Sequence, residues 1–239
     1  MTAESWAVTA LKIIPTMLLD PANAWRKLAS LSTRALLVPL LMVTVGTTCL
    51  LLFYYQQVNI GWLRDNMAAT ASPSQRDVLR NLMTRNTLFA IGAISVCVTV
   101  PLFHAIYGLY FFLVAKVTDL PFGFGKWFAF SVWSSVPNLL LIPAGVAAIL
   151  LTANGQLATE QLNPTSFNSL VFHFPQGHAW KTLLDSMSIM SLWSSVLMVI
   201  GLRVWTGVAP TRSIVLVLVP NAILYIPWIL VIMASRAVS

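Results

Sequence analysis

Five long apolar stretches constrain this 239-residue chain more than any other feature. A membrane span needs about 20 mostly apolar residues, and the segments that meet this length are 35–55, 88–115, 127–151, 183–202 and 214–234. Their apolar residues run continuously and do not alternate, which predicts helices and not the strands of a barrel. We therefore predict an all-α polytopic membrane protein. A bundle of five transmembrane helices would form one membrane domain over 35–234, followed by a short tail at 235–239.

The composition agrees with a lipid environment. Hydrophobic residues make up 58% of the chain and charged residues only 9%, whereas soluble domains are about a quarter charged. Lys and Arg number 14 against 7 Asp and Glu, but they lie between apolar runs and not on one face. This distribution argues against nucleic acid as a partner and indicates orientation signals and contacts to anionic headgroups. The lipid bilayer is the expected partner, and another membrane protein or a second copy of the chain remains open.

The N-terminal segment 1–34 carries apolar residues at helical spacing, and this predicts an interfacial amphipathic segment. Asp20 and Pro21 read as the N-cap and first position of a second short helix. Trp6 and Trp25 would anchor the segment at the headgroup level. The alternative is that the apolar stripe packs on the bundle.

Two features predict where helices bend and start. Prolines inside the spans predict kinks and short half-helices, because proline removes a backbone donor. These prolines are Pro101, Pro137, Pro143, Pro220 and Pro227. The sequence Ser72-Pro73-Ser74-Gln75 resembles a capping box and predicts a helix start in the long segment 56–87.

His104 lies in the middle of the second span, where an ionisable group is a functional candidate by default. It could serve in a proton relay or contact a polar ligand. Alternatively, it is a neutral imidazole bonded to a carbonyl freed by Pro101, or to a serine or asparagine across the helix interface. The other candidate polar or packing positions are Tyr107, Trp133, Pro137, Asn138 and Asn221. Asp185 is the one acid inside a predicted span.

The sequence offers no catalytic motif of the HExxH, GxSxG or GxxxxGK[ST] type. Cys49 and Cys97 lack metal-ligand spacing, and the five-residue separation of His173 and His178 does not enforce convergence. We therefore expect no enzymatic activity, no cofactor and no metal.

Several loose motifs occur together over roughly 18–234. Asp20-Pro21 is followed by Trp25 before the first span. His104, Tyr107 and Gly108 in the second span lead through Gly123 and Gly125 to Trp133 and Pro137 in the third. In this pattern the chain resembles the Yip family, the Ypt-interacting membrane proteins, in its bacterial branch. The resemblance implies a five-span fold and residence in the bacterial cytoplasmic (inner) membrane.

Eukaryotic relatives in that family lie in endoplasmic reticulum and Golgi membranes and bind Rab-type GTPases. That function is associated with a longer cytosolic N-terminal region, whereas 34 residues precede the first predicted span here and no DLYGP-like stretch is present. Rab-type GTPase binding is therefore not expected.

Three functions remain open. The first is a non-enzymatic membrane scaffold or assembly partner with a role related to lipid. The alternative is a permease-like subunit that moves a lipid or small molecule with a partner ATPase. An intramembrane enzyme ranks last.

The distribution of Lys and Arg favours an N-terminus inside, with 56–87 and 152–182 together on the outer side. Single cysteines at Ser72 and Thr165, in a background lacking Cys49 and Cys97, should therefore label alike with an impermeant maleimide. Opposite labelling would remove the five-span order, most simply by deleting the fourth span.

Overall fold

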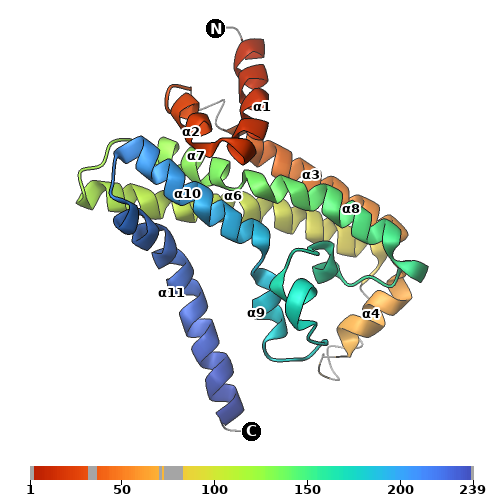
Figure 1. Ribbon diagram of the computed structural model, residues 1–239. Coiled ribbons are helices and arrows are strands. Elements are labelled where there is room, and N and C mark those ends of the chain that lie inside the picture. Colours follow the sequence, from red (N-terminus) through yellow and green to blue (C-terminus); the bar gives the residue numbers. More distant parts are fainter. Residues whose placement is uncertain (1–2, 32–36, 70–71, 73–82, 238–239) are drawn as a thin grey trace. The chain divides into compact units, whose positions relative to one another are not determined.

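The computed structural model describes residues 3–31, 37–69, 72 and 83–237 (Figure 1). This described part of the chain is helical and contains no β-strand, apart from one isolated bridge between Ser166 and Ser188. The helix start predicted around Ser72 to Gln75 falls largely on residues outside it.

Five helices are long and apolar enough to cross a membrane. They are α3 (Val38–Gln57), α6 (Arg85–Val117), the segment Phe124–Leu151, α10 (Ile189–Thr206) and α11 (Pro210–Ala237). The prediction of an all-α, multi-pass membrane protein is confirmed.

The third span is built from two half-helices. α7 (Phe124–Ser134) ends before a short 3₁₀ turn, η2 (Val136–Leu140), and α8 (Leu141–Leu151) completes the span. The break falls where Pro137 has no N–H to donate to the preceding turn. By contrast, α6 continues through Pro101, and α11 continues through both of its prolines.

The fourth span begins later than the sequence predicted. Instead of one helix over 183–202, a separate short helix α9 (Lys181–Ser186) precedes α10. The backbone between them pairs with a loop and cannot continue the helix: Phe167 N donates to Met187 O at 2.9 Å and Ile189 N donates to Thr165 O at 3.1 Å. The placement of Asp185 inside a span was therefore wrong, because it belongs to α9.

The chain folds as two units. The first combines Met1–Val43, Val100–Asn138 and Met190–Ser239, and the second combines Thr44–Thr99 with Leu139–Ile189. Each unit has its own buried aromatic or aliphatic core, and each is described separately below.

The core of the first unit is centred on Trp25 of α2 (Pro21–Ala29), which follows α1 (Ala3–Leu19). Its indole is fully buried and donates to Leu197 O of α10 at 3.0 Å, while the Trp205 indole donates to Trp25 O at 2.9 Å. The rings of Phe130 and Trp205 lie 5.0 and 5.2 Å from it. A side chain at Gly201 would collide with this indole.

Trp25 is therefore not an interfacial anchor, contrary to the sequence prediction. An apolar stripe at helical spacing has the same sequence pattern whether it faces lipid or protein. The hydrogen bond from the buried Trp25 indole to Leu197 O of α10 shows that Trp25 faces protein. The predicted N-cap is correct, since Asp20 Oδ1 accepts from Asn23 N at 3.2 Å. Trp6 belongs to α1, but its side chain is not among those described, so its role as an anchor stays a prediction.

Lys126 of α7 holds the end of α2. Its Nζ donates to Ala29 O at 2.9 Å, to Leu31 O at 3.0 Å and to Leu28 O at 3.4 Å. Carbonyls at a helix end have no partner within the helix and carry partial negative charge, so an ammonium group there satisfies both needs.

The second unit packs α3, α8, α4 (Ile60–Ala68) and the start of α6 around an aliphatic and tyrosine core. Arg85 closes the end of α3, donating to the carbonyls of Tyr55, Gln56 and Val58. Just beyond the ends of α3 and α8, Asn59 N donates to Gly155 O at 2.9 Å. This contact brings the segments after the first and third spans together.

Gly155 makes that contact possible. Its backbone adopts φ +63°, and a Cβ there would lie 2.6 Å from Gln57 O and 3.0 Å from Asn59 N. Only glycine accepts both the positive φ and the close approach.

In the first unit, α6 and α11 are joined where a proline leaves a carbonyl open. Pro220 has no N–H, so Leu216 O, four residues earlier, lacks its usual helical donor. The Tyr110 hydroxyl donates to this oxygen at 2.8 Å. A side chain of one helix thus replaces the missing backbone donor of another.

Because the Tyr110 hydroxyl replaces the N–H that Pro220 lacks, substitutions at positions 110 and 220 should be energetically coupled. Tyr110→Phe should lower the free energy of unfolding by about 1 kcal/mol, because it leaves Leu216 O without a donor. In a Pro220→Ala background the backbone N–H restored at position 220 bonds Leu216 O, and the same Tyr110→Phe change should cost clearly less. Thermal unfolding of the four proteins in detergent forms the double-mutant cycle. Equal costs in both backgrounds would contradict the exchange.

Candidate functional site

His104 is buried in the first unit, with 4% of its surface exposed, and both ring nitrogens have serine partners. Nδ1 lies 2.8 Å from Ser131 Oγ and Nε2 lies 3.3 Å from Ser135 Oγ. Ser135 donates its single hydroxyl proton to Val132 O at 2.8 Å, so it can only accept from Nε2–H. Nδ1 is then free to accept from Ser131. A neutral imidazole therefore satisfies every group in this cluster.

Of the two predictions for His104, the geometry fits the interhelical hydrogen bond. His104 belongs to α6 and both serines to the α7 end of the third span. The two helices approach closely, since a Cβ on Gly108 would lie 2.7 Å from Phe128 Cα. The imidazole thus links α6 to the third span where the two helices approach closely.

The remaining sequence candidates do not converge on one site. Tyr107 donates to Asn221 Oδ1 at 2.8 Å and joins α6 to α11. Trp133 is fully buried, and its indole N–H has no acceptor among the described residues. Pro137 and Asn138 lie in the η2 turn, and Asn138 N donates to Ser135 O at 2.9 Å.

Sequence analysis missed a charged cluster in the second unit. Lys181 Nζ lies 2.6 Å from Glu160 Oε1 and 2.7 Å from Asp185 Oδ2. Burial lowers the pKa of Lys181, but the hydrogen bonds and charges of Asp185 and Glu160 outweigh it, so that the pKa lies above its ordinary value. The contribution of the charged Lys181 to folding stability is therefore complete at neutral pH, and it is lost only as the pH rises through that raised pKa. The i, i+4 spacing of Lys181 and Asp185 was the available signal.

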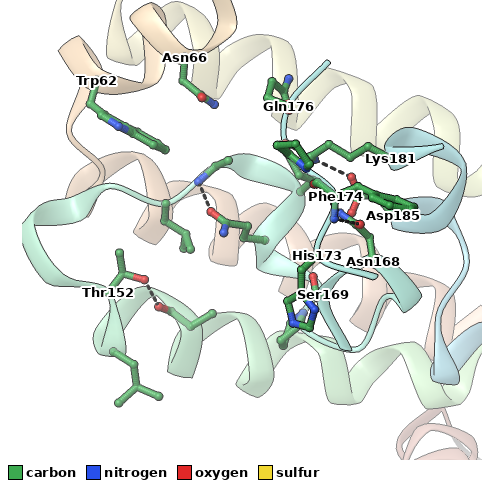
Figure 2. A pocket seen from close by; sticks show the side chains of 18 residues that line it. Trp62, Asn66, Thr152, Asn168, Ser169, His173, Phe174, Gln176, Lys181 and Asp185 are labelled. Carbon is green, nitrogen blue, oxygen red and sulfur yellow. Dashed lines mark hydrogen bonds and ion pairs between the residues drawn. The ribbon is translucent and has the colours of Figure 1, made fainter. Parts of the chain in front are cut away.

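This cluster lines a cavity of about 540 Å³ that lies entirely within the second unit. Figure 2 shows Trp62 and Asn66 of α4 on one side of it and Lys181 and Asp185 of α9 on the other. Thr152, directly after α8, lines a third part of the wall.

Neither region is arranged as a metal site. In the described part of the chain, no three His, Cys, Asp or Glu side chains come together. His173 lines the cavity, whereas the His178 ring stacks on Phe174 with centroids 3.8 Å apart.

Comparison with known proteins decides the family. The family model described as the Yip1 domain matches residues 16–231, which is nearly the whole chain. The chain belongs to the Yip1-domain family. Searches of curated proteins and of solved structures found no match.

In this Yip1 domain, the residues on which the resemblance rests are mainly packing positions. Gly108 permits the close approach of α6 and α7, Trp25 fills the core of the first unit, and His104 links α6 to the third span. The family match thus agrees with the fold.

The His104 bridge predicts a second coupling. His104→Leu should lower the unfolding temperature in detergent, because it leaves the Ser131 hydroxyl unpaired at a cost of about 1–3 kcal/mol. Adding Ser131→Ala removes that hydroxyl and should restore part of the loss. His104→Gln keeps hydrogen-bonding capacity and should stay folded and functional. Loss of function in His104→Gln at unchanged stability would instead require protonation of the imidazole.

Proposed function

We propose that this Yip1-domain protein is a non-enzymatic membrane scaffold, which assembles with another membrane protein or a second copy of itself within the lipid bilayer. The observation that carries the proposal is how its intramembrane polar side chains are used. His104, Tyr107 and Tyr110 all bond groups on neighbouring helices. A transport path or reaction centre needs polar groups that a substrate can reach. Here those groups fix helices relative to one another.

A scaffold also needs a surface for its partner, and α11 offers one. Only 6% of the residues in its apolar stretch are buried, the same share as in α6. Beyond Asn221, its outward residues Ile223, Ile226, Leu230 and Met233 recur at helical spacing and are exposed. A helix of another membrane protein can replace lipid on such a face through close packing. From the resemblance to the bacterial branch of the family, we propose that the protein lies in the bacterial cytoplasmic membrane. From the Lys and Arg distribution, we propose that its N-terminus is inside.

Affinity purification in mild detergent, with cross-linking and mass spectrometry, tests this function. We expect a membrane protein without nucleotide-binding motifs, or a second copy of the chain, to be recovered in fixed stoichiometry. Ile226→Ala/Leu230→Ala should reduce that recovery severalfold, because it removes packing contacts on α11. The matched control Ile94→Ala/Val98→Ala changes two exposed residues of α6 and should retain the partner.

The alternatives give different results. An ATPase in the complex, with hydrolysis stimulated by a lipid, would support the permease-like subunit instead. A chain recovered alone and monomeric would contradict the scaffold. If both double variants kept the partner, the α11 face would not be the contact surface.

A further inference from the structure

The cavity of the second unit has a chemistry that the scaffold function does not use. Glu160, Lys181 and Asp185 are its charged lining residues. Two carboxylates face one ammonium, so the cavity keeps one negative charge in excess. This excess favours a cationic group on whatever enters.

Polar and aromatic side chains extend this preference. Asn66 and Gln176 bring carboxamide oxygens to the cavity. Neither side chain makes a hydrogen bond to another residue in the described part of the chain. Trp62 adds an aromatic ring, whose face attracts cations. Carboxylate and amide oxygens accept hydrogen bonds, which a primary ammonium can donate and a quaternary ammonium cannot.

Lys181, in contrast, favours an anionic group on the ligand. Its ammonium has three N–H donors, and two of them bond Glu160 and Asp185. The third is available to an acceptor, and an anionic oxygen makes the strongest bond to it. The cavity therefore suits a ligand that carries an ammonium and an anionic oxygen a short distance apart.

The position of the cavity indicates that this ligand is a lipid. Its wall includes Ala148 and Leu151 from the last turn of α8, where an apolar span ends, and Leu151 is 85% exposed. Between the lining residues Ser169 and His173, three apolar side chains face outward: Leu170, Val171 and Phe172. Exposed apolar residues beside a span end are suited to the membrane interface, which is where headgroups lie.

We propose that this cavity binds the headgroup of a phospholipid with a zwitterionic aminoethyl phosphate, that is, of phosphatidylethanolamine. The ammonium lies against Glu160 and Asp185, the phosphate accepts from Lys181, and the acyl chains leave past Leu151. The site is confined to the second unit and does not depend on the scaffold function or on the α11 face.

Calorimetric titration of the purified full-length protein in detergent tests the proposal, with dihexanoyl phosphatidylethanolamine as the probe. We expect one lipid per chain and at least tenfold weaker binding of the dihexanoyl phosphatidylglycerol and phosphatidylcholine probes. Free phosphoethanolamine should bind at least tenfold more weakly than the lipid, since it lacks the apolar contacts. The titration contains no partner protein, so its result does not depend on whether the proposed scaffold function is correct.

Variants locate the site. Glu160→Gln/Asp185→Asn should weaken binding of the phosphatidylethanolamine probe at least tenfold. Asp65→Asn removes a charge from an exposed position of α4 outside the cavity and should leave affinity unchanged. If the double variant unfolds, Asn66→Leu keeps the ion pairs and the number and branching of side-chain heavy atoms, and it should weaken binding about fivefold. Equal affinity for the three lipids, unchanged affinity in the cavity variants, or binding of free phosphoethanolamine but not of the lipid would each overturn the proposal.

Discussion

A polar group inside the hydrocarbon layer finds no water, so a group left unpaired there costs free energy and a pairing within the protein is favoured. Both units are organised around this constraint. Where Pro220 leaves Leu216 O without a donor, Tyr110 supplies one. Arg85 occupies the last carbonyls of α3, and Lys126 occupies those of α2. In each case a side chain from another segment takes over the role of a backbone N–H, and the same bond that satisfies the carbonyl joins the two segments.

The spans could be predicted because lipid imposes one requirement on all of them, namely length and apolarity. Where the error was largest, a local interaction overrode that requirement. The stretch 183–202 is apolar enough to continue as a helix, but the backbone of Met187 and Ile189 pairs with residues 165–167, and the helix restarts at Ile189. No periodicity in the stretch reveals a partner that lies some twenty positions earlier. The division of the third span, by contrast, follows from Pro137, and the sequence predicted kinks or half-helices at such prolines.

The candidate site was predictable only in part. His104 stands out as an ionisable residue among apolar ones, and a serine partner was one of the options that the sequence allowed. Tyr110 does not stand out, because its role exists only in combination with a proline on another helix. The cavity was missed for a different reason. Glu160 and Asp185 meet at Lys181 only after α9 separates from the fourth span, and a sequence view that placed Asp185 in the membrane could not bring them together.

The burial of Trp25 has a consequence for how the protein is made. Its acceptor, Leu197, and its donor partner, Trp205, lie 172 and 180 positions later in the chain. During synthesis the α2 segment emerges first, and α7 can contact it early, yet the indole of Trp25 lacks both of these partners until the fourth span has been inserted. Throughout that interval a large aromatic side chain must be sheltered by lipid, by the insertion machinery or by a chaperone. The tryptophan that ends in the protein core is therefore a marker for the docking of the fourth span, because both of its hydrogen-bond partners lie on α10.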